Sequence, residues 1–128
     1  MRIRMAGKED FVEIHKLLAE IFPDAGARIG ENDSFFVAED NSLVGFVHFS
    51  EDERKIVVKG LGVAPGRRRG GVGGMLLDAL LARAKAGRKS VFLKTRVDNP
   101  AAGLYASRGF FVKKTRGGTL LMVLRSPN

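Results

Sequence analysis

The sequence predicts a mixed α/β fold around one core, with elements in the order β-α-βββ-α-β-α-ββ. Three observations carry this prediction. Two segments, residues 8–22 and 72–86, space their apolar side chains as amphipathic helices do. Short apolar runs bounded by glycine, proline and polar residues lie before, between and after these segments, as strands do. The 128 residues, 45% of them hydrophobic, suffice for a single domain spanning residues 1–128.

The N-terminal part is expected to supply one strand, the first helix and then three antiparallel strands. Pro23 ends the helix because proline cannot continue it, and a polar loop follows over residues 24–33. Polar turns at residues 40–42 and 51–53 separate the three later strands. The apolar face of the helix would comprise Phe11, Ile14, Leu17, Leu18, Ile21 and Phe22. The predicted strands are residues 3–5, 35–38, 44–49 and 56–63.

The C-terminal part is expected to cross over to a parallel strand and to finish in a hairpin. Gly87 is a suitable end for the second helix. The strand after it begins with a continuous apolar run, which is typical of a buried central strand. Asn99 and Pro100 then open a short third helix, with Asn99 at its cap. The predicted elements are helices at residues 72–86 and 99–107 and strands at 90–97, 110–112 and 119–124.

Charge divides the chain into an acidic and a basic part, with a net charge of +8 overall. Residues 1–53 contain 5 Lys or Arg and 12 Asp or Glu, which gives a net charge of −7. Residues 54–128 contain 17 Lys or Arg and only 2 Asp or Glu, which gives +15. Because a basic surface usually meets an anion, the C-terminal part is expected to bind an anionic partner.

Several classes of site are excluded by composition. No cysteine occurs, so disulfides, thiolate metal sites and a cysteine nucleophile are excluded. The two histidines, His15 and His48, lie on different predicted elements, and no metal site is expected. No apolar stretch approaches the roughly 18 residues of a membrane-spanning helix, and the first ten residues lack the apolar run of a signal peptide. These features predict a cytoplasmic protein with no membrane partner.

Residues 67–74 read RRRGGVGG and place three arginines and four glycines directly before the second helix. Glycine lets backbone N–H groups approach a ligand closely, and a helix N-terminus offers unpaired N–H groups and positive potential. This combination predicts a phosphate-binding loop, with a flexible basic loop before an ordinary helix as the alternative. The nucleotide P-loop does not fit, because Met75 stands where it requires lysine, and G-x-G-x-x-G is also missing.

Two longer motifs include or follow this loop. Residues 61–65 read LGVAP before it, and Arg68-x-x-Gly71-x-Gly73 completes it. Residues 99–110 read NPAAGLYASRGF, with Leu-Tyr followed by Gly-Phe. In this order and spacing, the two motifs resemble the acetyl-CoA-binding segment and the downstream Asn…Leu-Tyr…Gly-Phe segment of the GNAT acetyltransferase superfamily. The predicted element order is similar to the GNAT fold over nearly the whole chain.

The resemblance implies an acetyl-CoA-dependent N-acetyltransferase. The pyrophosphate would lie on backbone N–H groups of the glycine loop, with Arg67 and Arg69 as electrostatic support. The pantetheine arm would lie between the strands at residues 56–63 and 90–97, which splay apart in this family, and Gly60 and Gly62 would fit such a close approach. The implied cofactor-binding residues are Leu61, Gly62, Val63, Arg68, Arg69, Gly70, Gly71, Val72, Gly73, Gly74, Asn99, Ala102 and Tyr105.

The resemblance also implies catalytic roles. Tyr105, the only tyrosine, would protonate the departing thiolate of coenzyme A, with a place in the core as the alternative. Asn99 can serve as a helix cap, as a cofactor contact, or as both.

The general base is less defined. Many relatives carry a glutamate just before the Leu-x-Val-x-Pro segment, where this chain has Lys59 and Gly60. His48, on the preceding predicted strand, is the candidate catalytic base, and a structural histidine is the alternative. The proton of the amine could also pass to Glu39, Asp40, Glu51 or solvent.

The acceptor is expected to be a primary amine, acetylated directly without an acyl-enzyme. In the family, the first helix, its following loop and the early strands shape the acceptor pocket, and in this chain that part is acidic. We therefore expect a cationic acceptor, either a small-molecule amine or a peptide N-terminus; the alternative is that the acids only aid solubility. The acids concerned are Asp24, Glu31, Asp33, Glu51, Asp52 and Glu53.

Two further functions compete with this one. A coenzyme A-binding regulator without catalysis is favoured by the missing glutamate, whereas Tyr105 argues against it. A basic nucleic-acid-binding module would use the C-terminal charge, but the chain has no tryptophan, one tyrosine and no known nucleic-acid motif. No nucleic-acid partner is therefore expected. The final hairpin could pair with a second subunit, so a monomer and a homodimer both stay open.

Overall fold

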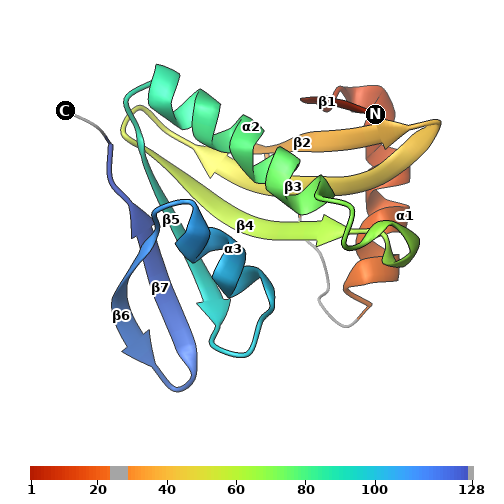
Figure 1. The fold of residues 1–128 in the computed structure, drawn as a ribbon. Coiled ribbons are helices and arrows are strands. Elements are labelled where there is room, and N and C mark those ends of the chain that lie inside the picture. Colours follow the sequence, from red (N-terminus) through yellow and green to blue (C-terminus); the bar gives the residue numbers. More distant parts are fainter. Residues whose placement is uncertain (24–28, 127–128) are drawn as a thin grey trace.

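The computed structural model describes residues 1–23 and 29–126 and contains a seven-stranded mixed sheet with helices on both faces (Figure 1). The predicted element order is confirmed. The strands are β1 (Arg2–Met5), β2 (Asp33–Asp40), β3 (Ser42–Glu51), β4 (Lys55–Val63), β5 (Ser90–Arg96), β6 (Phe111–Arg116) and β7 (Thr119–Leu124). The helices are α1 (Phe11–Ile21), α2 (Val72–Ala86) and α3 (Ala101–Ser107), with 3-10 turns at Lys8–Asp10 and Pro65–Arg67.

The strand order in the sheet is β1-β2-β3-β4-β5-β7-β6. All neighbouring pairs are antiparallel except β4 and β5, which are parallel as expected from the crossover through α2. This parallel pairing covers only residues 55–58 of β4 and 90–93 of β5. Beyond these residues the two strands diverge, so the sheet opens in its middle (Figure 1).

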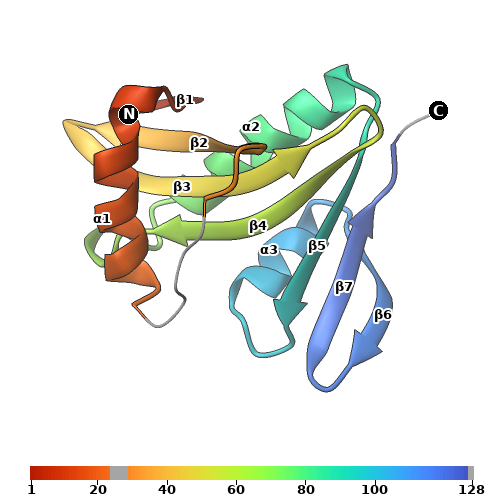
Figure 2. The ribbon, with the colours of Figure 1, turned by 180° about the vertical axis from the view of Figure 1, so that it is seen from behind.

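The helices cover the sheet unevenly. Helices α2 and α3 lie on one face and α1 on the other, where it covers the half of the sheet formed by the early strands (Figure 2). The core under α2 contains Val47, Phe49, Leu76, Leu77, Leu80 and Val91 among its buried residues. A second core, under α1, contains Ile14, Leu17, Leu18, Phe35, Val37, Leu43 and Phe46. No helix within the described residues combines the length and apolar character needed to span a membrane.

Element ends differ from the predictions in several places. Glu51 lies in β3 rather than in a turn, because the hairpin to β4 turns one residue later. Phe11 and Phe22, predicted on the buried face of the first helix, are 37% and 38% exposed because they stand at its two ends. The third helix begins at Ala101, two residues later than predicted. Strand β6 extends to Arg116, well beyond the predicted residue 112.

Candidate functional site

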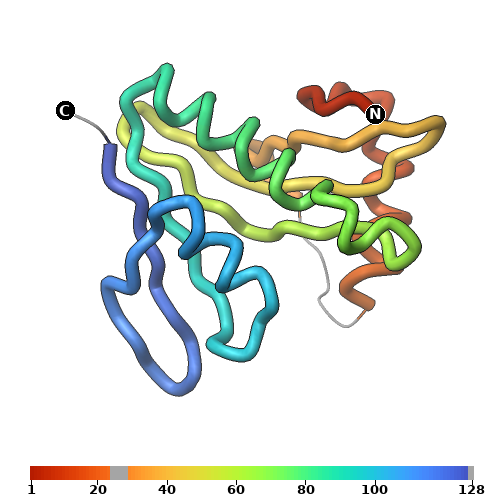
Figure 3. Tube along the Cα trace, viewed as in Figure 1, coloured from red at the N-terminus to blue at the C-terminus, as the bar shows by residue number. Residues whose placement is uncertain are grey.

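The glycine loop brings the chain from the end of β4 to the start of α2 (Figure 3). Gly71 is the N-cap of α2 and has φ 81°, a left-handed conformation that favours glycine. Arg69 also has a left-handed φ, 67°. No side chain of the described residues caps the helix, so the N–H groups of its first turn stay available. A Cβ on Gly71 would meet no atom within 4 Å, which leaves open space above this N-terminus.

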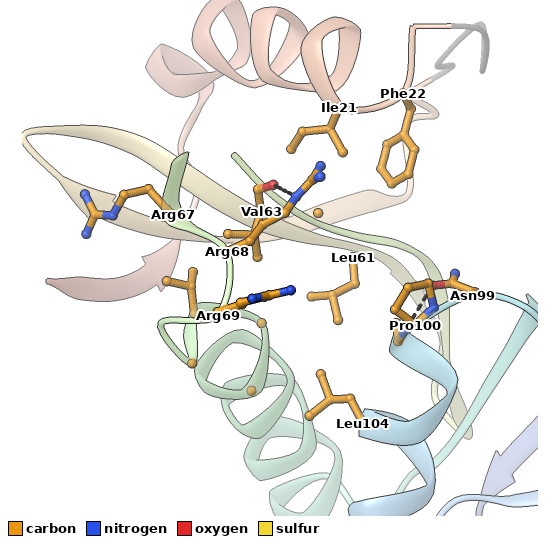
Figure 4. A pocket seen from close by; sticks show the side chains of 16 residues that line it. Ile21, Phe22, Leu61, Val63, Arg67, Arg68, Arg69, Asn99, Pro100 and Leu104 are labelled. Atoms are coloured by element: carbon orange, nitrogen blue, oxygen red, sulfur yellow. Dashed lines mark hydrogen bonds between the residues drawn. The ribbon is translucent and has the colours of Figure 1, made fainter. Parts of the chain in front are cut away.

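A cavity of about 620 Å³, here called the loop cavity, lies beside this helix start (Figure 4). It is bounded by the end of β4, the glycine loop, the first turn of α2, the start of α3 and the end of α1. Its lining includes ten of the predicted cofactor residues, namely Leu61, Gly62, Val63, Arg68, Arg69, Gly71, Val72, Gly73, Gly74 and Asn99. Gly70 and Ala102, also predicted, are not among its lining residues, whereas Ile21 and Phe22 of α1 are.

The three arginines of the loop take different directions. Arg67 is among the residues that line the cavity, but its side chain points outward and pairs with Asp40 through Nη2 at 2.7 Å. Arg68 Nε donates a hydrogen bond of 3.1 Å to the Val63 carbonyl. Arg69 extends over the cavity beside Leu61 (Figure 4). Arg69 is therefore the loop arginine best placed to meet an anion, although the sequence motif pointed to Arg68.

A smaller cavity of about 260 Å³, the strand opening, lies where β4 and β5 diverge. Tyr105 lines it and is 5% exposed, with its ring edge-on to Phe110 at 5.7 Å between centroids. Burial raises the pKa of Tyr105 to about 12, so the phenol stays protonated at neutral pH. A proton donor therefore stands at the opening between the two strands.

Thr95 was not singled out by the sequence, yet it lines the same opening. Its Oγ1 is buried and has no hydrogen-bond partner among the described residues. Buried hydroxyl groups are nearly always paired, so this oxygen is available to a bound molecule. A threonine in a strand carries no special signal in the sequence, which is why only the structure identifies it.

Asn99 lines both the loop cavity and the strand opening. Its Oδ1 accepts a hydrogen bond of 2.9 Å from the N–H of Ala101, the first residue of α3. The predicted capping contact is thus present, made from one residue before the N-cap position. Because this contact uses only the carbonyl oxygen, the amide NH₂ stays compatible with a second contact.

His48 lies in a cluster with Asp33 and Lys59, in which the His48 and Asp33 side chains are buried and that of Lys59 is exposed. Its Nε2 is 2.8 Å from Asp33 Oδ2, and its ring stacks on Phe35 at 4.4 Å between centroids. Lys59 Nζ pairs with the second oxygen of Asp33 at 2.7 Å. Burial raises the pKa of Asp33, but hydrogen bonds from Lys59, the Gly30 N–H and His48 outweigh it and lower that pKa to about 2. Asp33 is therefore a fixed carboxylate that orients the imidazole of His48.

His48 also lies next to the strand opening. It is paired across β3 and β4 with Gly60, which lines that opening. Directly opposed residues of antiparallel strands share a face, so the missing side chain of Gly60 leaves room beside the imidazole. The register shift at this point makes Lys59 an extra, bulged residue.

The remaining candidate bases are engaged in ion pairs. The Arg4 guanidinium lowers the pKa of Glu39, and the Arg67 guanidinium lowers that of Asp40. Burial raises the pKa of Glu51, but hydrogen bonds from Lys89 and Arg83 outweigh it and lower the pKa overall. Carboxylates with lowered pKa values are weak bases, and none of the three lines the loop cavity or the strand opening.

The acids predicted to attract a cationic acceptor are not gathered at one surface. Asp24 lies outside the described residues, whereas Glu31 and Glu53 are exposed. Asp33 is buried against His48 and Lys59, and Asp52 accepts hydrogen bonds from the N–H groups of its own turn. Within the described residues, no group of three or more His, Cys, Asp or Glu side chains is placed to hold a metal ion.

Comparison with solved structures shows where this fold recurs. The ribosomal-protein-S18-alanine N-acetyltransferase of Escherichia coli superposes with a TM-score of 0.81 at 20% identity, covering 96% of this chain and 92% of that one. Aminoglycoside 6'-acetyltransferase type Ii gives 0.81 at 19% identity, covering 100% and 99%. The putative acetyltransferase yncA of Salmonella typhimurium, solved with acetyl-CoA, gives 0.79 at 21% identity, covering 100% and 95%. These likenesses establish the fold.

The family follows from the sequence itself. No curated protein matches this chain significantly. The family model described as the acetyltransferase (GNAT) family, however, matches residues 5–110, which is most of the chain and includes both motifs around the loop cavity and the strand opening. The chain therefore belongs to the GNAT family of N-acetyltransferases, which use acetyl-CoA as the acetyl donor.

Proposed function

We propose that residues 1–128 act as one N-acetyltransferase domain that moves the acetyl group of acetyl-CoA directly to a primary amine. The observation that carries this proposal is the meeting of three features at the divergence of β4 and β5. The loop cavity reaches it from the free N-terminus of α2, Tyr105 lines it, and His48 lies beside it across Gly60. A thioester, a proton donor and a base could thus share one small space.

The residues of the loop cavity fit acetyl-CoA, which supplies a thioester-bound acetyl group when bound. The N–H groups of the first turn of α2 would hold the pyrophosphate, aided by Arg69. The backbone of Leu61 and Val63, beyond the paired part of β4 and β5, would hydrogen-bond the amides of the pantetheine arm. The unpartnered Thr95 Oγ1 is a further polar contact available at the reacting end.

Two side chains would then move the protons. Tyr105 would donate its phenolic proton to the departing sulfur, which its raised pKa supports because the phenol is protonated at neutral pH. His48 would take a proton from the acceptor amine, directly or through water. Asp33 acts as a positioning residue, since it binds His48 Nε2 and carries its charge at all ordinary pH values. Direct transfer is supported by the absence of cysteine from the chain.

The acceptor proposed here is a primary amine, carried by a small molecule or by a peptide N-terminus. Its predicted positive charge does not gain support from the contacts, because Asp33 and Glu51 are engaged with basic side chains of the protein itself. A cytoplasmic location and a monomeric or homodimeric state stay predictions.

The proposal is tested by mixing protein, acetyl-CoA and a panel of amines and peptides, and measuring free coenzyme A thiol. The protein has no thiol of its own, so the thiol signal comes from coenzyme A, and a sample without protein gives the spontaneous background. We expect acetyl transfer to at least one amine, with Asp33→Asn lowering kcat by about tenfold and changing the pH profile. Glu53→Gln, in an exposed turn, is the control and should change neither. Binding of acetyl-CoA without transfer to any amine would instead favour a non-catalytic coenzyme A-binding regulator.

A further inference from the structure

One face of the C-terminal half of the sheet is covered by none of the helices of residues 1–23 and 29–126. Helices α2 and α3 cover the opposite face of β5 and β7, whereas α1 lies over the half formed by the early strands (Figure 2). The buried residues Leu93 and Met122 belong to the core under α2, so the residues on either side of each point to the uncovered face. This surface is called here the basic sheet face, and its cations are Lys55, Lys59, Lys94, Arg96, Lys114 and Arg116.

The sheet register aligns these cations in rows across the strands. Leu121 of β7 is paired with Lys94 on one side and with Lys114 on the other. Thr119 is paired in the same way with Arg96 and Arg116. Directly paired residues share a face, so each row places two cations about 10 Å apart, one strand spacing on each side of β7.

Little negative charge balances these rows. Strands β4, β5, β6 and β7 contain no Asp or Glu. Lys59 pairs with Asp33, and Arg96 pairs with Asp98 at 3.3 Å between two exposed side chains. Among the contacts of the described residues, no acidic side chain pairs with Lys55, Lys94, Lys114 or Arg116. A bound anion would therefore relieve repulsion between like charges.

The basic sheet face leads directly to the proposed reaction site. A groove of about 500 Å³ on this face is lined by Val57, Phe92 and Leu121 together with Lys55, Lys59 and Lys94. The strand opening, which contains Tyr105 and Thr95, shares four lining residues with this groove, namely Val58, Lys59, Leu93 and Lys94. A molecule lying in the groove would thus present one end to Tyr105 from the face opposite α2 and α3.

We propose that the acceptor is an acidic polypeptide whose N-terminal amine enters the strand opening while its carboxylates lie along the basic sheet face. This inference rests on the proposed function. The cations of the basic sheet face extend from β4 to β6, roughly 14 Å at three strand spacings, which is longer than a small amine. An extended peptide covers that distance with about four or five residues. The half-buried Val57, Phe92 and Leu121 give its apolar side chains a place to pack.

Binding of three short peptides with free N-termini, labelled at the C-terminus, tests this inference by fluorescence anisotropy with coenzyme A present. One peptide carries Asp and Glu, the second has Asn and Gln in their place, and the third has Lys. We expect the acidic peptide to bind at least about tenfold more tightly than the amide peptide, with the difference falling as salt is raised. We also expect this acidic peptide to be acetylated with the highest kcat/KM of the three.

Two charge reversals locate the binding surface. Lys94→Glu and Lys114→Glu should each weaken binding of the acidic peptide about fivefold, as expected for exposed, screened pairs. Lys85 is an exposed residue of α2, on the other face of the sheet. Lys85→Glu makes the same charge change there and should leave binding of the acidic peptide unchanged. A small anionic amine would depend on Lys94 alone, because Lys114 lies two strands away from β5. Calorimetric titration of acetyl-CoA should give the wild-type affinity for Lys114→Glu and Lys85→Glu, neither of which lines the loop cavity or the strand opening.

Several results would overturn the inference. Equal binding of acidic and amide peptides, or an equal loss with Lys85→Glu, would remove the basic sheet face as a specific surface. An oligonucleotide that binds through Lys94 and Lys114 while no acidic peptide does would assign the face to nucleic acid. Self-association lost with Lys114→Glu, without peptide binding, would assign it to a second copy of the chain.

An acidic peptide that binds but is not acetylated, while another amine is, would refute the acceptor assignment and leave the proposed function standing. Failure of the wild-type protein to bind acetyl-CoA would refute the proposed function instead.

Discussion

Arg68 Nε donates a hydrogen bond of 3.1 Å to the carbonyl oxygen of Val63. The guanidinium thereby folds back from the glycine loop onto the end of β4. Val63 is one of the two residues whose backbone we propose pairs with the pantetheine arm, so Arg68 and acetyl-CoA would compete for one acceptor. Binding would then release Arg68 from Val63 and leave its guanidinium free to reach the phosphates.

Arg68→Ala should accordingly have a small net effect on acetyl-CoA affinity, about three- to fivefold weaker, because the loss of a cation is partly offset by the freed carbonyl. Arg69→Ala should cost more, about tenfold, since Arg69 already extends over the loop cavity. Calorimetric titration of acetyl-CoA into both variants measures which substitution weakens binding more. Arg2→Ala, at an exposed arginine outside the loop cavity, is the control. A larger loss for Arg68→Ala than for Arg69→Ala would contradict the geometry.

Gly71→Ala tests the left-handed N-cap of α2. A Cβ there meets open space, so the cost comes from the φ of 81° alone. We expect a loss of about 1 kcal/mol in the free energy of unfolding. Gly66→Ala, which also meets no atom within 4 Å and has no left-handed φ, is the matched control and should cost little. Urea unfolding of the two variants measures this difference. Equal free energies of unfolding would show that alanine at position 71 is not strained by the left-handed φ.

Tyr105→Phe tests the proton donor. The variant keeps the ring that packs against Phe110, so its stability and its affinity for acetyl-CoA should change little. We expect kcat to fall about 100-fold, as for loss of a general acid. Because burial raises the pKa of Tyr105 to about 12, the wild-type kcat should show no alkaline decline near the ordinary value of 10.0 from this group. An unchanged kcat in the variant would place Tyr105 in the core alone.

Gly62→Ala and Gly60→Ala form a second matched pair. A Cβ on Gly62 would lie 2.9 Å from Cε2 of Phe46, whereas one on Gly60 would have its nearest neighbour at 3.9 Å. Gly62→Ala should therefore destabilise the protein by about 1–3 kcal/mol through overpacking. Gly60→Ala should leave stability within about 0.5 kcal/mol of the wild type. Thermal unfolding followed by circular dichroism separates the two, and the reverse order would show that Phe46 can move aside.

The Arg4–Asp10 pair predicts how stability depends on pH. Hydrogen bonds from Arg4 and from the Gly7 N–H lower the pKa of Asp10 from 3.8 to about 2. A lowered folded-state pKa contributes stability that is present above 3.8 and is lost as the pH falls through about 2. Asp10→Asn should be less stable than wild type at neutral pH, and the difference should shrink across that window. Urea unfolding at several pH values measures it; a difference independent of pH would assign the effect to packing.

The motifs around the loop cavity could be predicted from sequence because they combine residue types that packing alone seldom requires side by side. Four glycines beside three arginines at a helix start indicate anion binding, and the structure places most of them at one cavity. The sequence predicted that Gly62 gives room to a bound cofactor. In the structure the ring of Phe46, a residue of the protein itself, lies close to the position that a Cβ on Gly62 would take. A glycine in a strand indicates that something lies close, but the sequence does not say what.

Pairing between distant residues could not be predicted in this way. The Asp33–His48–Lys59 cluster joins three strands, and the unpartnered Thr95 hydroxyl depends on how β4 and β5 diverge. The charge of the acceptor-binding surface also depends on pairing between residues that are distant in the sequence. The count of acids in residues 1–53 suggested a cationic acceptor, yet five of the twelve pair with basic residues of the protein itself, namely Asp10, Asp33, Glu39, Asp40 and Glu51. On the basic sheet face, by contrast, Lys55, Lys94, Lys114 and Arg116 pair with no acidic side chain of the described residues.

Calorimetric titration of acetyl-CoA into the wild-type protein and into Gly71→Glu tests the central claim most directly. We expect micromolar binding by the wild type and loss of binding in Gly71→Glu, because the new carboxylate would stand in the open space above the N-terminus of α2, where the pyrophosphate is proposed to lie. Tyr105→Phe should bind as the wild type does, which separates the cofactor site from the proton donor. No binding by the wild type, or binding unaffected by Gly71→Glu, would contradict the assignment of the glycine loop as the acetyl-CoA site.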